Sequence, residues 1–173
     1  MRKAALVLCA LLVASAGFLW FKRSQHHKPA QPAVATSQFK KACDVFTLQD
    51  ANAVLGSGTT QTPSHTDSVT AQKAVTTCLY SYDPGSFSDL ISASVLLQGA
   101  TAASTKQSFS DARPDNAQTV TGYGDQAFWD PNLGQLQILK GQYWVIIAAG
   151  SGPLTQRDQD LPHKIADIIV KRL

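Results

Sequence analysis

The chain has 173 residues, of which 44% are hydrophobic, so it corresponds to one globular domain with an added N-terminal segment and is too short for a barrel enzyme or a two-domain transferase. Seven of the 15 Lys and Arg residues precede residue 42, whereas the chain from Cys43 onward has eight basic and twelve acidic residues, a net charge of −4. The predicted domain therefore lacks the basic face with which a nucleic-acid binder neutralises phosphates.

Residues 4–21 form an uncharged, mostly apolar run that is flanked by Arg2-Lys3 and Lys22-Arg23. As a helix this run would extend roughly 27 Å, close to the thickness of a bilayer core. The aromatic residues next to Lys22 resemble an interfacial anchor, so residues 1–23 are predicted to be a transmembrane signal anchor. The alternative is a signal peptide, with secretion after cleavage near Ala16, because small residues follow the apolar stretch there.

Residues 24–41 contain two prolines, two adjacent histidines and few large apolar side chains, a composition typical of a flexible linker. Such a linker would span about 25 Å and would hold a domain of residues 42–173 clear of the headgroups. The paired histidines lack the further ligands that a metal site requires. Lipidation is not expected at Cys9, because a bulky residue precedes it where a lipoprotein signal needs a small one.

Two cysteines, Cys43 and Cys78, fall within the predicted domain. In an oxidising compartment they would most simply pair, and the bond would stabilise the fold by roughly 4 kcal/mol in the chain-entropy model. The alternative is a pair of buried thiols in a cytoplasmic domain. The export-type N-terminus favours the disulfide. There is no Cys-x-x-Cys spacing, which argues against redox exchange and structural zinc.

The first part of the domain shows helix caps, a turn signal and alternating hydrophobicity. Thr47 and Asp50 form an N-cap signature, and the apolar spacing that follows them ends at Gly56. Asp83-Pro84-Gly85 is a strong turn signal. The elements predicted here are a helix from Thr47 to Gly56, strands over residues 76–82 and 91–98, and a helix over about residues 101–112.

The second part is richer in strand signals. A tight connection at Lys140-Gly141 predicts a hairpin between the last two strands. Both faces of residues 142–149 are apolar, so this strand is predicted to be central and covered on each side. The elements predicted here are strands over residues 126–129, 135–140 and 142–149, and a final helix that carries Leu161, Ile165, Ile168 and Ile169 on one stripe.

These elements follow one another in the order α-β-β-α-β-β-β-α, preceded by the transmembrane helix. Hairpins and tight turns favour an antiparallel sheet. We therefore predict an α+β fold in which helices pack on an antiparallel sheet of about five strands.

Catalytic signatures are weak in this chain. His163 lies in the first turn of the last predicted helix, and no Gly-x-Ser-x-Gly elbow or spaced triad accompanies it. Asp158 and Asp160 lack the neighbouring oxygen ligands of a calcium site and are interpreted as acids near a helix N-terminus. No catalytic residue, metal or cofactor is predicted.

The segment Gly122-Tyr123-Gly124-Asp125-Gln126-Ala127 superficially matches a nucleotide-binding motif. It opens a strand rather than a helix, however, so we interpret it as a tight turn whose glycines allow positive φ and whose Asp125 bonds nearby backbone amides. Tyr123, Asp125 and Trp129 surround this turn and are our candidates for a partner-binding or ligand-binding edge.

Three motifs carry a resemblance: Ala42-Cys43-Asp44-Val45, Cys78-Leu79-Tyr80, and the segment from Gly122 to Ala127. Together they resemble an uncharacterised family of secreted actinobacterial lipoproteins and membrane-anchored envelope proteins, over most of residues 42–173. The resemblance implies a Cys43–Cys78 disulfide, a PsbP-like α/β sandwich and no catalytic residues. The chain departs from the family by lacking the lipid-attachment cysteine, which favours an apolar anchor.

The function predicted from the sequence is that of a membrane-anchored extracytoplasmic domain, a non-enzymatic binding or accessory module of the cell envelope. Its predicted partners are the membrane, through the N-terminal helix, and an envelope protein or small ligand. Two alternatives are an envelope hydrolase that uses His163 or Asp125, and a structural subunit of a membrane complex.

Overall fold

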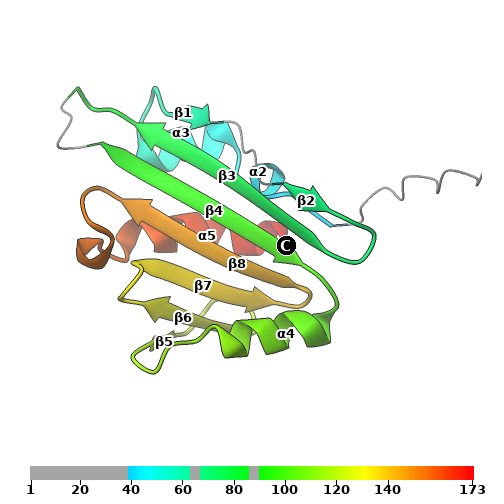
Figure 1. The fold of residues 1–173 in the computed structure, drawn as a ribbon. Helices are drawn as coiled ribbons and strands as arrows, with labels where there is room; N and C mark the ends of the chain where they lie inside the picture. Colours follow the sequence, from blue (N-terminus) through cyan, green and yellow to red (C-terminus); the bar gives the residue numbers. More distant parts are fainter. Residues whose placement is uncertain (1–38, 63–66, 86–89) are drawn as a thin grey trace, which may run out of the picture. The chain divides into compact units, whose positions relative to one another are not determined.

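A computed structural model describes residues 39–62, 67–85 and 90–173. These residues form an α+β domain around a single eight-stranded sheet in which all neighbouring strands are antiparallel (Figure 1). The strands are β1 (Thr60–Thr62), β2 (Ser68–Val69), β3 (Ala74–Tyr82), β4 (Ile91–Gly99), β5 (Gln118–Val120), β6 (Gln126–Asp130), β7 (Gln135–Lys140) and β8 (Tyr143–Gly150). They lie in the order β1-β3-β4-β8-β7-β6-β5, and β2 also pairs with β3.

Four α-helices and one short 3-10 helix complete the described part of the chain. They are α2 (Ala42–Val45), α3 (Leu48–Leu55), α4 (Ala102–Asp111), η2 (Leu154–Gln156) and α5 (Asp160–Arg172). In Figure 1, α3 and α5 lie behind the sheet and α4 lies along its lower margin.

The prediction of about five strands in the order α-β-β-α-β-β-β-α is wrong. The five predicted strands are present as β3, β4, β6, β7 and β8, and three further strands of two or three residues, β1, β2 and β5, extend the sheet. These short strands are polar and almost entirely exposed, so they carry no alternation that a sequence pattern could reveal. Helix α2, four residues long, was also not predicted.

The predicted transmembrane helix of residues 1–23 lies outside the described residues. Within residues 39–62, 67–85 and 90–173, every helix is too short or too polar to cross a membrane.

Local chemistry explains where α3 begins and ends. The Thr47 side chain accepts a hydrogen bond from the Asp50 amide, and the Asp50 carboxylate accepts one from the Thr47 amide, which together form a capping box. At the other end Gly56 has φ of 140°, and a Cβ there would lie 2.6 Å from the Tyr82 ring. A glycine is therefore needed to end the helix against β3.

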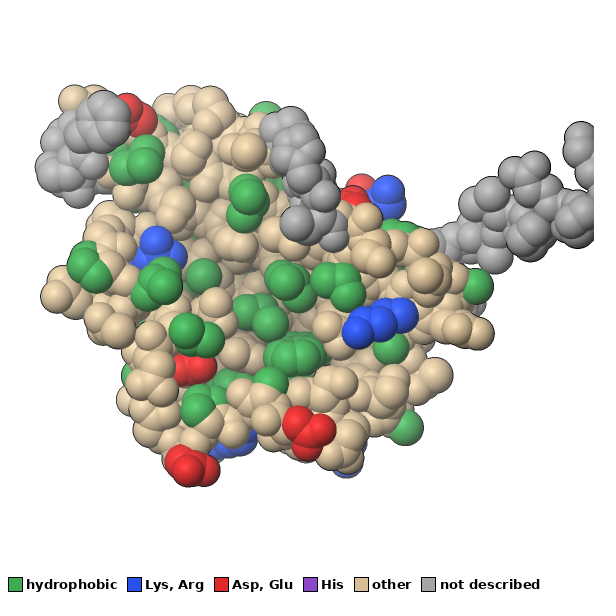
Figure 2. All heavy atoms as spheres, viewed as in Figure 1, with side chains coloured by type: hydrophobic (Ala, Val, Ile, Leu, Met, Phe, Trp, Pro, Cys, Tyr) green, Lys and Arg blue, Asp and Glu red, His purple; other side chains and the backbone are tan. Residues whose placement is uncertain are grey.

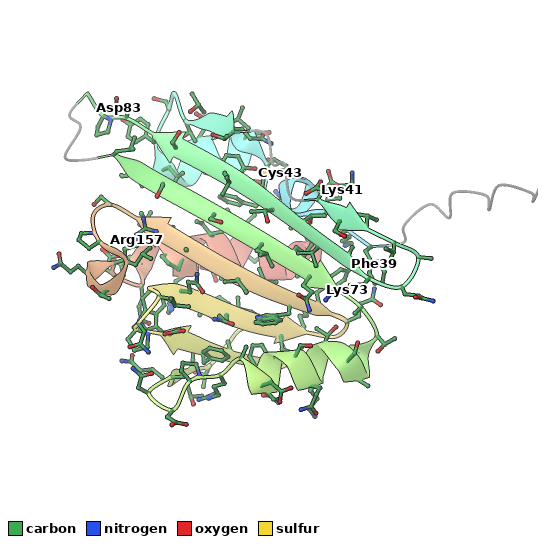
Figure 3. All side chains as sticks on the ribbon, viewed as in Figure 1. Phe39, Lys41, Cys43, Lys73, Asp83 and Arg157 are labelled. Atoms are coloured by element: carbon green, nitrogen blue, oxygen red, sulfur yellow. A yellow bond between two sulfur atoms is a disulfide. The ribbon has the colours of Figure 1, made fainter. Side chains whose placement is uncertain are left out.

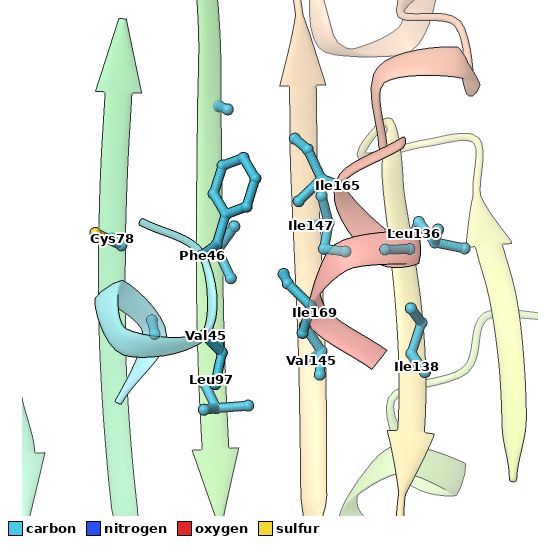
Figure 4. Packing of buried hydrophobic residues seen from close by; sticks show 14 of the residues in the cluster. Val45, Phe46, Cys78, Leu97, Leu136, Ile138, Val145, Ile147, Ile165 and Ile169 are labelled. Atoms are coloured by element: carbon cyan, nitrogen blue, oxygen red, sulfur yellow. The ribbon is translucent and has the colours of Figure 1, made fainter. Parts of the chain in front are cut away.

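One face of the sheet carries the main core. Its strands contribute alternate residues that pack against α2, α3 and α5 (Figure 4). The largest fully buried side chains of this core include Phe46, Leu97, Leu136, Ile138, Ile147, Ile165 and Ile169. This covered face uses the apolar stripe that the sequence predicts for the last helix.

Charged groups fasten the ends of the covering helices. Arg172, near the end of α5, donates to the Asp50 carboxylate with an Nη2–Oδ1 distance of 2.9 Å. This guanidinium is the main reason that the pKa of Asp50 falls from 3.8 to about 2. The ammonium groups of Lys40 and Lys140 donate to the carbonyl groups of Arg172 and Val170 at the C-terminal end of α5.

The opposite face of the sheet is only partly covered. Helix α4 packs Phe109 against Phe128, with 5.0 Å between the ring centroids, and against Leu139 and Trp144. Beyond this small cluster no helix of the described residues lies on this face of β3, β4 and β8. The prediction that β8 is covered on both sides is therefore wrong, because Trp144, Ile146 and Ala148 are only half-buried.

Candidate functional site

The disulfide between Cys43 and Cys78 is present, with a Cα–Cα distance of 5.2 Å. It joins α2 to the middle of β3 and so fastens the N-terminal helices to the sheet. Tyr80, two residues further along β3, donates a hydrogen bond to the Phe46 carbonyl, and burial raises the pKa of Tyr80 to about 12. The bond thus crosslinks two elements of the core. The predicted pairing of Cys43 with Cys78 is confirmed.

The predicted glycine turn is also present. Gly122 and Gly124 have φ of 91° and 54°, and a Cβ at Gly124 would lie 2.3 Å from the Leu139 carbonyl oxygen. The Asp125 amide donates to that carbonyl at 2.8 Å, and the Asp125 carboxylate accepts a 2.8 Å bond from the Gly141 amide. The turn is thus docked on the β7–β8 hairpin, and Asp125 holds it there.

A hollow of about 340 Å³ lies beside this turn and is lined by Arg113 and residues 119–127. Tyr123 and Asp125, two of the three residues chosen from the sequence, are among its lining residues. Its charged groups already have partners, because Asp125 accepts from Gly141 and Arg113 donates to the Thr119 hydroxyl at 2.8 Å. The Arg113 guanidinium also lies 5.2 Å from the centroid of the Phe128 ring. The hollow therefore offers mainly neutral polar and backbone groups to a ligand.

Trp129 does not join Tyr123 and Asp125 at this hollow. It is 4% exposed and belongs to the main core, where it pairs with Leu136 across the β6–β7 ladder. Strand β6 is buried at four consecutive positions, so its residues show no alternation that would mark Trp129 as pointing inward.

His163 packs against Tyr123, with 5.4 Å between the ring centroids. Burial, together with the nearby Asp167 carboxylate, raises the pKa of Tyr123. The Nε2 atom of His163 is buried and has no hydrogen-bond partner. In the described residues His163 Nε2 therefore accepts no hydrogen bond from a nucleophile, as the base of the hydrolase alternative would have to.

The feature that sequence reasoning missed is the part of the sheet that no helix within residues 39–62, 67–85 and 90–173 covers. Alternation and strand register place one set of side chains on this side of β3, β4 and β8, and each of them is half-buried or exposed. We call this set the open face; it consists of Val75, Thr77, Leu79, Ser81, Ser92, Ser94, Leu96, Gln98, Ile146 and Ala148.

The open face contains no Lys, Arg, His, Asp or Glu. Leu96 lies opposite Ile146 across the β4–β8 ladder, and Leu79 on β3 is 37% exposed. Figure 2 shows hydrophobic side chains gathered over the middle of the sheet, with charged side chains around the margin. The solvated face of an antiparallel sheet is normally polar, so an uncharged and partly apolar one is unusual.

Among the described residues there is no cluster of three or more His, Cys, Asp or Glu side chains that could hold a metal ion. Comparisons of this chain with protein-family models, with curated proteins and with solved structures give no match. The resemblance to the actinobacterial envelope family and to the PsbP-like fold therefore stays a prediction from the motifs.

Proposed function

We propose that this chain is an exported, non-catalytic binding module of the cell envelope that recognises its ligand or partner with the open face. The observation that carries the proposal is the composition of that face, which exposes Leu79, Leu96 and Ile146 with no charged side chain among them. Binding to such a surface desolvates no charged side chain of the open face and gains free energy from the burial of its apolar area.

Export is supported by two independent features. The disulfide between Cys43 and Cys78 is the type of bond that persists in oxidising compartments. The apolar run of residues 4–21, which lies outside the described residues, is typical of a segment that directs a protein into or across a membrane. Both features support a location at the envelope, where membrane lipids and envelope proteins would be available to the domain.

Photo-crosslinking in the producing cells tests this proposal. The photoreactive residue p-benzoylphenylalanine replaces Leu96 on the open face or, as the control, Lys164 on α5, which is exposed on the side of the sheet that the covering helices occupy. We expect adducts from position 96 that are absent at position 164. Equal adduct patterns from both positions would contradict a binding role for the open face.

A further inference from the structure

Arg157 lies at one end of the open face. It follows η2, and its stem packs against β8, since a Cβ at Gly150 would lie 3.2 Å from the Arg157 Cγ. Its Nη2 atom donates to the Ser92 hydroxyl at 3.2 Å, and Ser92 pairs with Gly150 across the β4–β8 ladder. Figure 3 shows Arg157 at the end of β8, where these strands meet the loop that leads to α5.

The charge of Arg157 is not compensated within the described structure. The ion pair found among these residues joins Asp50 to Arg172 and does not involve Arg157. The Nε atom of Arg157 is buried and has no hydrogen-bond partner, and burial lowers the pKa of this guanidinium. A buried N–H group of a cation costs free energy unless it donates a hydrogen bond to an acceptor. The acceptor that best fits the geometry and charge of a guanidinium is an oxyanion.

The rest of the open face suits a hydrocarbon chain. From Ser92 to Gln98 the face extends about 20 Å along β4, at ~3.3 Å per residue. This length exceeds the ~15 Å that one leaflet contributes to a bilayer core. At the end away from Arg157, Trp144 pairs with Gln98 and contacts Phe109 of α4, with 6.3 Å between the ring centroids, so α4 bounds the face there.

We propose that the open face binds a lipid with a single alkyl chain and an anionic headgroup. The headgroup oxyanion pairs with the Arg157 guanidinium, and the chain lies along β4 and β8 over Leu96, Ile146 and Ala148. This inference rests on the proposed function and names its ligand.

A lipid fits better than a protein partner. A protein interface places a polar and charged rim around an apolar centre, whereas this face has no charge along its length. Lys73 precedes β3 at the end away from Arg157 and is exposed to solvent, whereas the Arg157 guanidinium is partly buried and its Nε lacks an acceptor. An anionic group at the Arg157 end and an apolar remainder along the strands match this arrangement.

Three matched probes test the ligand chemistry on the full-length chain in phosphatidylcholine nanodiscs: monooleoyl glycerol phosphate, monooleoyl glycerol and glycerol phosphate. Native mass spectrometry measures how much of each probe is bound. We expect the lipid phosphate to bind at least about tenfold more tightly than the neutral lipid, because the neutral lipid has no oxyanion to pair with Arg157. We expect a similar advantage over glycerol phosphate, which has no chain.

Variants locate the bound lipid. Arg157→Gln is expected to weaken binding of the lipid phosphate about tenfold and to leave the neutral lipid unchanged. Ala148→Asp places a carboxylate in the path of the chain and is expected to weaken binding of the lipid phosphate at least about tenfold. Lys164→Gln, which removes a positive charge from α5, is the control and should change nothing. Thermal unfolding of each variant confirms that it folds, and the three probes on the unaltered chain do not depend on any variant.

Several outcomes overturn the inference. If the neutral lipid binds as tightly as the lipid phosphate, Arg157 has no role in binding. If glycerol phosphate binds as tightly as the lipid phosphate, the site binds an anion but no alkyl chain. Failure of all three probes would also overturn it, as would position 96 crosslinking to protein alone. In either of these last two cases the proposed function is judged separately. It stands if position 96 gives adducts that position 164 does not.

Discussion

The two faces of the sheet are built from the same strands and differ in how far helices cover them. On β8, Ile147 is fully buried under α5, whereas the adjacent Ile146 is half-buried on the open face. Both are isoleucines in one strand, and they differ because α5 covers Ile147 whereas α4 covers only the end of β8 near Trp144 on the other face. An apolar residue on the covered face stabilises the fold, and one on the open face would be available to the ligand that we propose.

The disulfide gives the largest expected effect, because it joins α2, which helps to cover one face, to β3. Replacing Cys43 and Cys78 together with Ser is expected to lower the free energy of unfolding by about 4 kcal/mol, since a closed loop is lost from the unfolded chain. Urea unfolding with and without reductant measures the loss. The reduced unaltered protein should match the double variant, and no loss in either would show that the bond does not hold the covering helices.

Ile147→Ala and Ile146→Ala form a matched pair that tests whether the two faces of the sheet differ in packing. The first leaves a cavity beneath α5 and is expected to cost about 3 kcal/mol, whereas the second removes a half-exposed side chain and should cost about 1 kcal/mol. Urea unfolding of both variants gives the difference. Equal losses would mean that the second face is also packed, and the open face would then be part of a core.

These two faces also show what the sequence could reveal. Alternation in residues 91–98 predicted one buried face for β4, and the structure agrees, with Val95 and Leu97 buried. Residues 142–149 are apolar on both sides, and this pattern predicted full burial. It could not distinguish a second core from a binding surface, because both favour the same side chains.

The candidate residues divide in a similar way. Tyr123 and Asp125 were chosen from the glycine turn and line a hollow, although Asp125 is used to hold the turn. Trp129 is buried because the register of β6 turns it toward the covered face. Arg157 carried no local signal, since its position depends on a contact with Ser92, which is 65 residues away in the chain.

The ion pair between Asp50 and Arg172 gives the covered face a pH dependence that the open face lacks. Because the pKa of Asp50 is lowered from 3.8 to about 2 in the folded protein, its contribution is complete above about pH 4 and is lost as the pH falls toward 2. We expect about 1 kcal/mol from this pair, since Arg172 is 40% exposed and solvent screens it.

Asp50→Asn tests this pair. The variant should lose stability near neutral pH, because it gives up both the ion pair and its share of the capping box. It should then show a shallower decline than the unaltered protein between pH 4 and pH 2. Parallel pH profiles for the two proteins would remove Asp50 as the titrating group.

The smallest expected effect on stability belongs to the open face itself. Leu96→Gln should change the free energy of unfolding by less than about 1 kcal/mol, because Leu96 is only half-buried. It should nevertheless weaken binding of the lipid phosphate, since it removes apolar area from the path of the chain. Urea unfolding and native mass spectrometry of the same sample separate the two effects. A large loss of stability would show that Leu96 belongs to the fold rather than to a binding surface.

The most direct measurement of whether the open face binds is the yield of photo-crosslinked adduct from position 96 compared with position 164 in living cells. We predict abundant adducts at position 96 and none above background at position 164, because only the first lies among the uncharged, half-buried residues of β3, β4 and β8. Adducts of equal yield and identity at the two positions would contradict the assignment of this face as the binding surface.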